Sequence, residues 1–268
     1  MKLYDYYRES ANLTLNGALA AVVPVVLLLM LNAFFMHMKD VMYYCFPFFF
    51  YSIFCFQIYL FKMKRSMKIF QNINVQTKMN ASIFNSRQLL LFFTSTFKPK
   101  LFLFFSDGTM AGEIVRLKKN MNNLDRLPPA KRRREMYSLL DHEGTEIGKY
   151  IVCKNKGIDV EIYNDKNEYI GSFHKGKKTL FECANKEILD STGRVFGKVE
   201  GASFFMKEII KNVENEEIAK LSRGVLPIEW EGRIPDANTP VFTFNTPFSG
   251  DTKLLALSLL IDQYFIER

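Results

Sequence analysis

Two long segments without a charged residue constrain this chain more than any other feature. Leu13–Phe35 and Val41–Phe61 are apolar almost throughout, and the short turn HMKD lies between them. A helix rises about 1.5 Å per residue, so each segment can cross a hydrocarbon core of roughly 30 Å. The first segment is too long for a signal peptide, and no small-residue cleavage site follows it. Residues 1–61 are therefore predicted to form a transmembrane helical hairpin, with spans at about 13–35 and 41–61.

The charges around this hairpin predict its orientation. Because the turn is short, both outer ends must face the same side of the membrane. The segment KMKRSMK follows the second span directly, whereas the turn offers one Lys and one Asp. The positive-inside rule then places the N-terminus and everything after Phe61 in the cytoplasm. We expect an integral two-span protein, with both termini cytoplasmic, in the plasma membrane.

The net charge of +8 comes from the region just after the spans. Residues 62–134 contain 16 Lys and Arg against three acidic residues, whereas residues 135–268 contain 17 against 22. Each cation held near a negatively charged leaflet gains on the order of 1 kcal/mol. The basic residues either contact lipid head groups or an acidic partner, or they set the topology and form solvated loops. The candidate lipid-binding residues are Lys62, Lys64, Arg65, Lys68, Lys131, Arg132, Arg133 and Arg134.

Beyond residue 85, one pattern of turn residues recurs five times. In each copy a turn with Asp or Asn carries a Gly or Asn, and a small residue follows four positions later. The pairs are Gly108 and Gly112, Gly144 and Gly148, Asn167 and Gly171, Gly193 and Gly197, and Asn215 and Ala219. The first residue of each pair is expected to have a positive φ, and the small residue marks a bend or a close approach by another backbone. Five such hairpins predict an all-β domain in which these glycines are structural.

The C-terminal segment predicts a helix with no polar face. A helix over residues 252–267 would be about 24 Å long, which is short for a span, and it would contain Asp262. A helix that is apolar on all sides must be surrounded on all sides. Its length and Asp262 favour the interior of a barrel over a bilayer. The predicted fold is thus a membrane-anchored all-β protein: two N-terminal helices, a basic linker (62–85), and an antiparallel β-barrel (86–268) around a buried C-terminal helix.

These repeated D-x-x-G-x-x-h-G-x-h hairpins, followed by the hydrophobic LLALSLLID, resemble the tubby-like superfamily. That group includes the LURP-one-related proteins and the phospholipid scramblases. The resemblance covers roughly residues 86–268 and implies a closed barrel around a hydrophobic C-terminal helix. The Cys-rich and calcium-binding stretches of the scramblases have no counterpart here, so the resemblance implies a general affinity for lipid and no more.

Enzyme chemistry and metal binding have no support in the sequence. It contains no G-x-S-x-G, P-loop, Rossmann glycine pattern, HExxH or CxxC, and only three His. We therefore expect no enzymatic activity, no cofactor, no metal and no nucleic-acid partner. The expected function is a membrane-tethered cytoplasmic binding module that engages anionic lipid head groups or a membrane-protein partner. The alternatives are a regulatory or structural subunit of a membrane complex, with FPFFFYSIFCF as its helix-packing face, and a scramblase-like lipid transporter.

Overall fold

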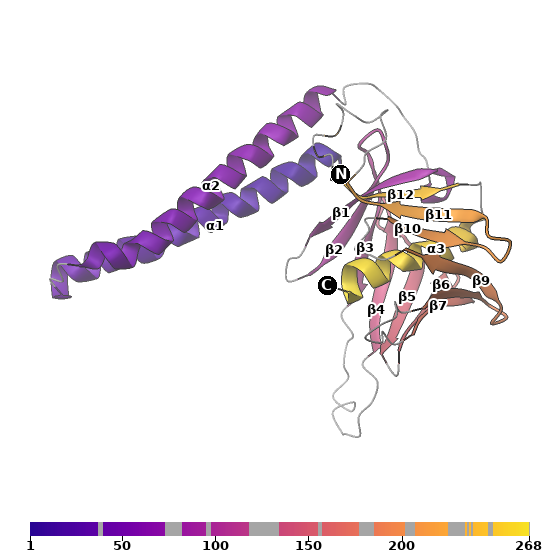
Figure 1. The fold of residues 1–268 in the computed structure, drawn as a ribbon. Helices are drawn as coiled ribbons and strands as arrows, with labels where there is room; N and C mark the ends of the chain where they lie inside the picture. Colours follow the sequence, from indigo (N-terminus) through magenta and orange to yellow (C-terminus); the bar gives the residue numbers. More distant parts are fainter. Residues whose placement is uncertain are drawn as a thin grey trace, which may run out of the picture. The chain divides into compact units, whose positions relative to one another are not determined.

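The computed structural model describes residues 1–36, 40–72, 82–94, 98–117, 134–154, 157–176, 185–201, 207–224, 234, 236, 238–245 and 249–267. The chain forms two compact units. One consists of Met1–Gln76 with Gly232–Pro235, and the other of Thr77–Glu231 with Asp236–Arg268. The first unit contains the two long helices and the second contains the β-sheet (Figure 1).

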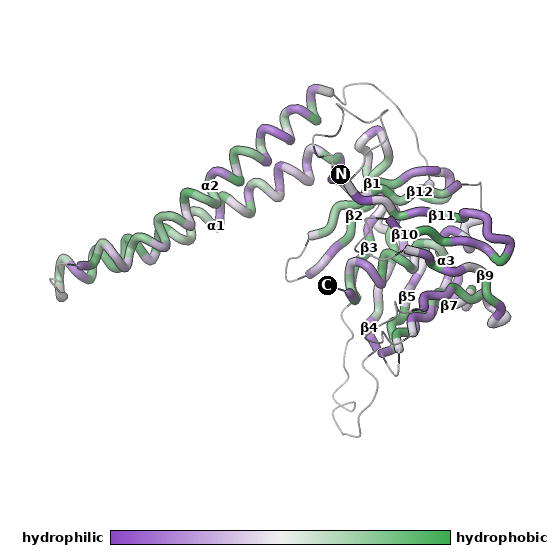
Figure 2. Tube along the Cα trace, in the orientation of Figure 1, coloured by the Kyte–Doolittle hydropathy of each residue, from purple (hydrophilic) through white to green (hydrophobic). Residues whose placement is uncertain are grey.

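The first unit is an antiparallel pair of helices, α1 (Leu3–Leu31) and α2 (Val41–Asn72), with a short π-helical segment η1 (Asn32–Met36) after α1. Hydrophobic residues dominate both helices (Figure 2). Each is long and apolar enough to cross a membrane, over Leu3–Phe34 and Val41–Gln71. Both helices extend beyond the predicted spans, and α2 runs on without a break through residues 62–72, which the sequence assigned to a linker.

Small side chains allow the two helices to approach closely. On α1 the buried residues include Ala11, Ala18 and Ala21. A Cβ added at Gly17 would lie 4.0 Å from Sγ of Cys55 on α2. Apolar helices associate through such small residues because their backbones can then pack together.

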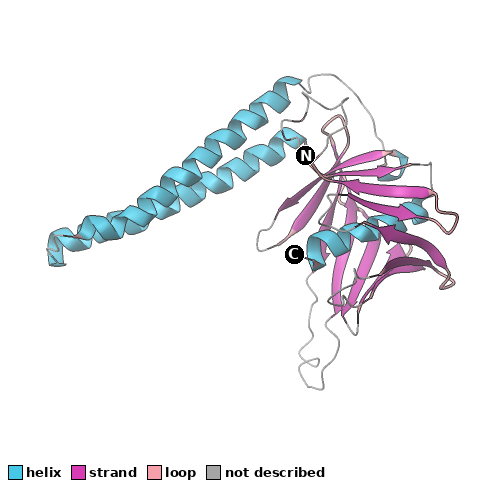
Figure 3. Ribbon diagram, viewed as in Figure 1, coloured by secondary structure: helices cyan, strands magenta, loops and turns pink. Residues whose placement is uncertain are grey.

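Twelve antiparallel strands in the described part of the second unit close into a barrel (Figure 3). Every strand pairs with its neighbours in sequence, and β1 closes the barrel against β12, with Gln88 opposite Thr243. The strands are β1 (Gln88–Thr94), β2 (Lys100–Phe104), β3 (Met110–Leu117), β4 (Arg134–Asp141), β5 (Glu146–Lys154), β6 (Ile158–Asn164), β7 (Tyr169–Lys175), β8 (Lys186–Asp190), β9 (Val195–Glu200), β10 (Lys207–Lys211), β11 (Glu217–Ser222) and β12 (Val241–Phe244).

The C-terminal helix fills the barrel, as the sequence predicted. Helix α3 (Gly250–Ile261) continues into the π-helical segment η6 (Asp262–Ile266), and every residue from Lys253 to Tyr264 is buried. Ser249 caps its start by accepting a hydrogen bond from the Thr252 amide. Its apolar side chains form one core cluster with the inward-facing residues of the strands. The predicted fold class, two apolar helices followed by an antiparallel barrel with a buried C-terminal helix, is confirmed.

The repeated turn pattern has a common backbone geometry. The turn residue of each pair has a positive φ: Gly108 (77°), Gly144 (85°), Asn167 (59°), Gly193 (82°) and Asn215 (65°). In each hairpin the register shifts by one residue just before the small residue, which is the signature of a β-bulge. The constant offset of four therefore combines a left-handed turn residue with a bulge.

The small residues also make room for the helix. A Cβ at Gly148 would lie 2.6 Å from Cδ2 of Leu254, and one at Gly171 would lie 2.8 Å from Cδ2 of Leu255. Both distances are too short for any side chain larger than hydrogen. The expected close approach by another backbone is confirmed at Gly171, where a Cβ would lie 2.2 Å from the carbonyl oxygen of Leu189. At Gly148 the close neighbour is the helix side chain instead.

The topology gives the barrel two different ends. Because neighbouring strands are antiparallel, the five tight turns lie at one end, here called the turn end. The opposite end, where β1, β3, β5, β7, β9 and β11 finish, is here called the loop end. Helix α3 begins at the turn end, where Leu254 meets Gly148, and finishes at the loop end, where Asp262 meets the last residue of β7.

Candidate functional site

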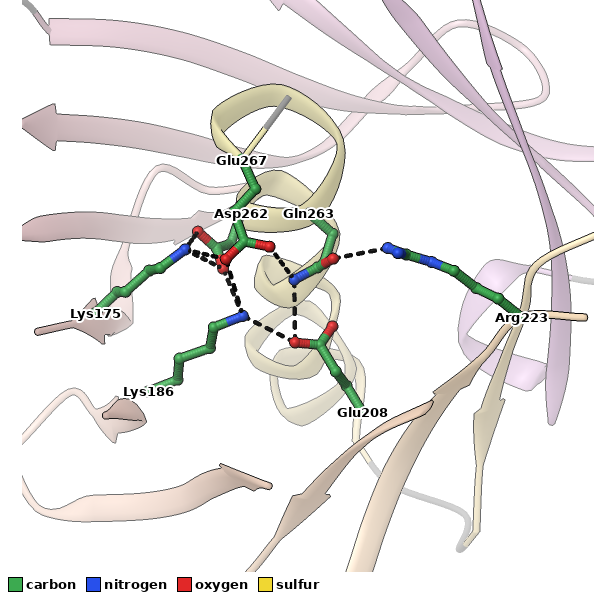
Figure 4. Close-up of polar contacts among 7 residues, drawn as sticks. All are labelled: Lys175, Lys186, Glu208, Arg223, Asp262, Gln263 and Glu267. Carbon is green, nitrogen blue, oxygen red and sulfur yellow. Dashed lines mark hydrogen bonds and ion pairs between the residues drawn. The ribbon is translucent and has the colours of Figure 1, made fainter. Parts of the chain in front are cut away.

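Seven polar side chains gather around the end of the central helix, at the loop end of the barrel (Figure 4). Three of them come from η6 and the residue that follows it, three from strand ends around the barrel wall, and one from the residue that follows β11. We call this group the buried ion cluster. Its members are Asp262, Gln263, Glu267, Lys175, Lys186, Glu208 and Arg223.

Asp262 is the centre of the buried ion cluster. Its side chain is completely buried, and it faces two ammonium groups from adjacent strands. Nζ of Lys175 lies 2.8 Å from Oδ1, and Nζ of Lys186 lies 3.0 Å from Oδ2. A buried carboxylate is stable only when it is paired and hydrogen-bonded, and here both oxygens have a cationic donor.

Gln263 connects the remaining members. Its amide nitrogen donates to Oε1 of Glu208 at 3.0 Å and to Oε2 of Glu267 at 2.7 Å. Its amide oxygen accepts from Arg223 at 2.7 Å. The one neutral member therefore links cations and carboxylates into a single network, in which removing one partner affects the others.

The charges in the buried ion cluster balance, with three cations and three carboxylates. Burial lowers the pKa of the Lys186 ammonium, but the carboxylates of Asp262 and Glu208 outweigh it and hold that pKa above its ordinary value. Burial also raises the pKa of Glu208, against the pull of Lys186. Both pKa values are raised, so Lys186 and Glu208 each hold a proton more tightly in the folded barrel than the same groups do in water. Glu208 Oε2 is buried and, within the described residues, accepts no hydrogen bond.

The position of the cations also suits the helix. The carbonyl groups at a helix C-terminus carry a partial negative charge, which nearby cations stabilise. Lys175, Lys186 and Arg223 supply three cations at this end. We conclude that the arrangement fastens the end of the helix inside the barrel. The described residues contain no group of three or more His, Cys, Asp or Glu side chains that could hold a metal ion.

The structure places the predicted lipid-binding residues in both units. Lys64 and Lys68 are exposed on α2. Lys62 donates to Oγ of Ser10 at 2.8 Å, and Arg65 stacks on Phe61, with its guanidinium carbon 4.2 Å from the ring centroid. Arg134 is exposed at the first position of β4, at the loop end, whereas Lys131, Arg132 and Arg133 lie outside the described residues.

The uncharged stretches of the two helices end at the same position along the helix pair, here called the common level. The Lys62–Ser10 hydrogen bond joins the first charged residue after the uncharged stretch of α2 to the residue next to Glu9 on α1. Beyond that level Ser66 donates to the Tyr4 carbonyl at 2.9 Å, so the helices stay paired outward. The charged residues on this outer part are Lys2, Arg8, Lys62, Lys64, Arg65 and Lys68 against Asp5 and Glu9.

The turn end of the barrel has the opposite charge. Its five tight turns, residues 105–109, 141–145, 164–168, 190–194 and 212–216, carry eight acidic and two basic side chains. The acidic residues are Asp107, Asp141, Glu143, Asp165, Glu168, Asp190, Glu214 and Glu216, and the basic ones are Lys166 and Arg194. An anionic surface would therefore be repelled from the turn end.

The buried ion cluster was not predicted from the sequence. Asp262 served there only as evidence against a membrane span. The available signal was that a carboxylate in a fully buried helix requires a cation nearby. Lys175 and Lys186 share the inward alternation of Phe173 and Ile188 along their strands, which indicates that both ammonium groups lie inside the barrel.

No known protein-family model matches this sequence, and no curated protein is similar to it.

Proposed function

We propose that the protein is an integral membrane protein in which α1 and α2 form a two-span anchor. The uncharged stretches of both helices end at the same level, where Lys62 meets Ser10, and a bilayer boundary would explain this coincidence. The cations beyond that level favour a cytoplasmic outer end by the positive-inside rule. Both termini and the barrel then lie in the cytoplasm, and the plasma membrane is the proposed location.

The barrel is, in this proposal, a non-enzymatic binding module of the tubby-like type. Its closed antiparallel wall, five matching hairpins and buried apolar C-terminal helix support that assignment. The helix occupies the interior of the barrel, so a ligand would bind to the outer surface of the barrel or to one of its ends.

Anionic lipid head groups are the proposed ligand, and the observation that carries this is the charge difference between the two ends of the barrel. The turn end has eight acidic and two basic side chains, whereas the exposed Arg134 stands at the loop end. Residues 118–133, which join β3 to β4 there, contain six Lys and Arg against one Asp in sequence. The loop end is therefore the end proposed to engage lipid.

Fluorescence quenching in vesicles tests this proposal on the full chain. Single probes replace Thr94, at the loop end, and Val213, at the tip of a turn, so that no charge is altered. We expect lipids with spin-labelled head groups to quench the Thr94 probe when the vesicles contain phosphatidylserine. The effect should weaken as salt shortens the Debye length from about 10 Å at 0.1 M.

The Val213 probe is the matched control and should not respond to phosphatidylserine. Equal quenching in neutral and anionic vesicles, or stronger quenching at Val213, would contradict the lipid proposal. A double variant, Lys64→Gln with Lys68→Gln, reports separately on the cations of the anchor. Both side chains are exposed, so the change should leave the pairing of the helices intact.

A further inference from the structure

A second group of charged side chains lies at the loop end of the barrel, on other strands than the buried ion cluster. It consists of Arg116 on β3, Glu135 on β4 and Lys154 on β5, and we call it the rim group. Each of the three lies two residues from a side chain of the apolar core, namely Ile114, Tyr137 and Val152. Because alternate side chains of a strand share one face, the rim group points into the mouth of the barrel.

Both cations of the rim group share one oxygen of a single carboxylate. Nη2 of Arg116 lies 3.2 Å from Oε1 of Glu135, and Nζ of Lys154 lies 3.8 Å from the same oxygen. Among the described residues, neither cation forms another ion pair. The rim group therefore has one more positive charge than its carboxylate balances, whereas the buried ion cluster has equal numbers of each sign.

The two cations are also the accessible members of the rim group. The side chain of Arg116 is 49% exposed and that of Lys154 is 44% exposed, whereas that of Glu135 is 16% exposed. An anion that enters the mouth would thus meet the cations before the carboxylate. A guanidinium has five N–H donors, and the contact with Glu135 leaves most of them available.

A buried tyrosine holds the carboxylate in place. Oε2 of Glu135 accepts a hydrogen bond of 2.8 Å from the hydroxyl of Tyr137, whose ring centroid lies 4.7 Å from that of Phe265 on η6. Burial, together with the hydrogen bond to Glu135 and its charge, raises the pKa of Tyr137, so the hydroxyl stays protonated and donates. Charged groups that a buried neighbour orients lose little freedom when they bind, which is typical of a binding site and not of a solvated surface pair.

We propose that the rim group binds a phosphate group, to which Arg116 and Lys154 donate from the two strands that flank Glu135. This inference rests on the proposed function, because it names the side chains at the loop end that hold the anionic head group. The planar guanidinium matches two phosphate oxygens at once, and the ammonium adds a compact second charge. A lipid head group and a soluble phosphate compound both carry this chemistry, and the experiments below distinguish the two sources.

Head-group quenching of the Thr94 probe tests the rim group in the full chain. Thr94 pairs with Lys100 and Lys100 with Val115, so the probe lies two strands, about 10 Å, from the strand position next to Arg116. In vesicles that contain phosphatidic acid, we expect Lys154→Gln and Arg116→Gln each to reduce the quenching several-fold. Lys198→Gln removes the same charge from another ion pair and should have little effect. Equal quenching in all three variants would overturn the proposal.

The substitution Arg116→Lys separates phosphate binding from a general attraction between charges. It keeps the positive charge but removes the planar fork, so quenching should fall several-fold relative to the wild type. Quenching as strong as in the wild type would overturn the assigned role of the guanidinium. Thermal unfolding of each variant identifies those that fold, and Lys154→Gln preserves the test if a substitution at Arg116 prevents folding.

Calorimetry with inorganic phosphate, on the full chain in detergent at constant ionic strength, distinguishes the two sources. Heat of binding that Lys154→Gln abolishes would support the rim group with a soluble phosphate as its ligand. Quenching by phosphatidic acid that excess inorganic phosphate does not reverse would support the lipid. Quenching that is unchanged in the Arg116→Gln and Lys154→Gln variants would overturn the rim group alone. The absence of both signals in the wild type, with phosphatidic acid and with phosphatidylserine, would overturn the lipid proposal as well.

Discussion

Lys175 Nζ lies 2.8 Å from Asp262 Oδ1, which joins the end of β7 to the central helix inside the barrel. Lys186, at the start of β8, holds the other oxygen of the same carboxylate. One helix residue thus connects two neighbouring strands, and the four other members of the buried ion cluster lie around these contacts. The apolar contacts of α3 are non-directional, so these directional contacts fix how deep the helix sits and how it is rotated.

The first prediction concerns Asp262. We expect Asp262→Asn to destabilise the barrel by about 3–5 kcal/mol, because it removes the fully buried carboxylate that Lys175 and Lys186 share and leaves the buried network with one more cation than carboxylates. Chemical unfolding of the full chain in detergent measures the loss. The control is Lys198→Gln. It removes the ion pair in which Lys198 Nζ lies 3.5 Å from Glu187 Oε1 near the surface, and it should cost about 1 kcal/mol or less. Similar losses for both variants would show that the cluster does not fasten the helix.

The second prediction concerns the apolar core of the helix. Leu257 is fully buried, so Leu257→Asp places a carboxylate without a partner among apolar side chains. The expected cost is several kcal/mol, comparable to the whole stability of a domain, and cooperative unfolding should disappear. Leu257→Met preserves volume and should cost less than about 1.5 kcal/mol. A barrel that still melts cooperatively with aspartate at this position would contradict the central helix.

The third prediction concerns the space that Gly148 leaves for the helix. Gly148→Ala should destabilise by about 1–3 kcal/mol, because the new methyl group would overlap Leu254. Gly176→Ala is the matched control, since the nearest atom there is 3.7 Å away. In a double-mutant cycle, Leu254→Ala should reduce the penalty at Gly148. Strictly additive effects would mean that the two residues do not contact each other.

The fourth prediction concerns Asp190 and pH. Its carboxylate accepts hydrogen bonds from the Thr192 hydroxyl and from the Arg194 and Thr192 amides, and these hold the pKa of Asp190 below its ordinary value of 3.8. A lowered pKa means that this contribution to stability is present above pH 3.8 and is lost as the pH falls through the pKa in the folded state.

The substitution Asp190→Asn should remove this part of the acid dependence while keeping the turn. Asn164 and Asn212 occupy the equivalent positions and accept the same amide bonds. Urea midpoints measured at several pH values compare the Asn variant with Asp190→Ala, which should be less stable at every pH. An unchanged acid dependence in the Asn variant would contradict the assignment to Asp190.

The fifth prediction concerns topology. In a chain without native cysteines, Asn122→Cys should not react with a membrane-impermeant reagent in intact cells, because the proposed topology puts everything after α2 in the cytoplasm. Asp40→Cys, in the turn between the helices, should react. Permeabilised cells are the control and should label both variants. Strong labelling at Asn122 in intact cells would reverse the proposed orientation.

The sequence alone determined the parts of this protein that depend on local patterns. Two long segments without a charged residue predicted the two apolar helices. The paired turn and small residues, such as Asn167 and Gly171, predicted the hairpins, because positive φ and the loss of a side chain are properties of single positions. The absence of a polar face in the C-terminal segment predicted that its helix is buried, since such a helix is stable only when it is surrounded on all sides.

Only the tertiary structure decided which distant residues meet. Lys175 lies 87 residues before Asp262, and nothing in the local alternation of β7 specifies that its last inward position faces the helix end. The level shared by Ser10 and Lys62, 52 residues apart, likewise depends on how α1 and α2 pair. Such contacts follow from strand order, barrel closure and helix depth, and these arise from the packing of the whole chain, which no single stretch of sequence encodes.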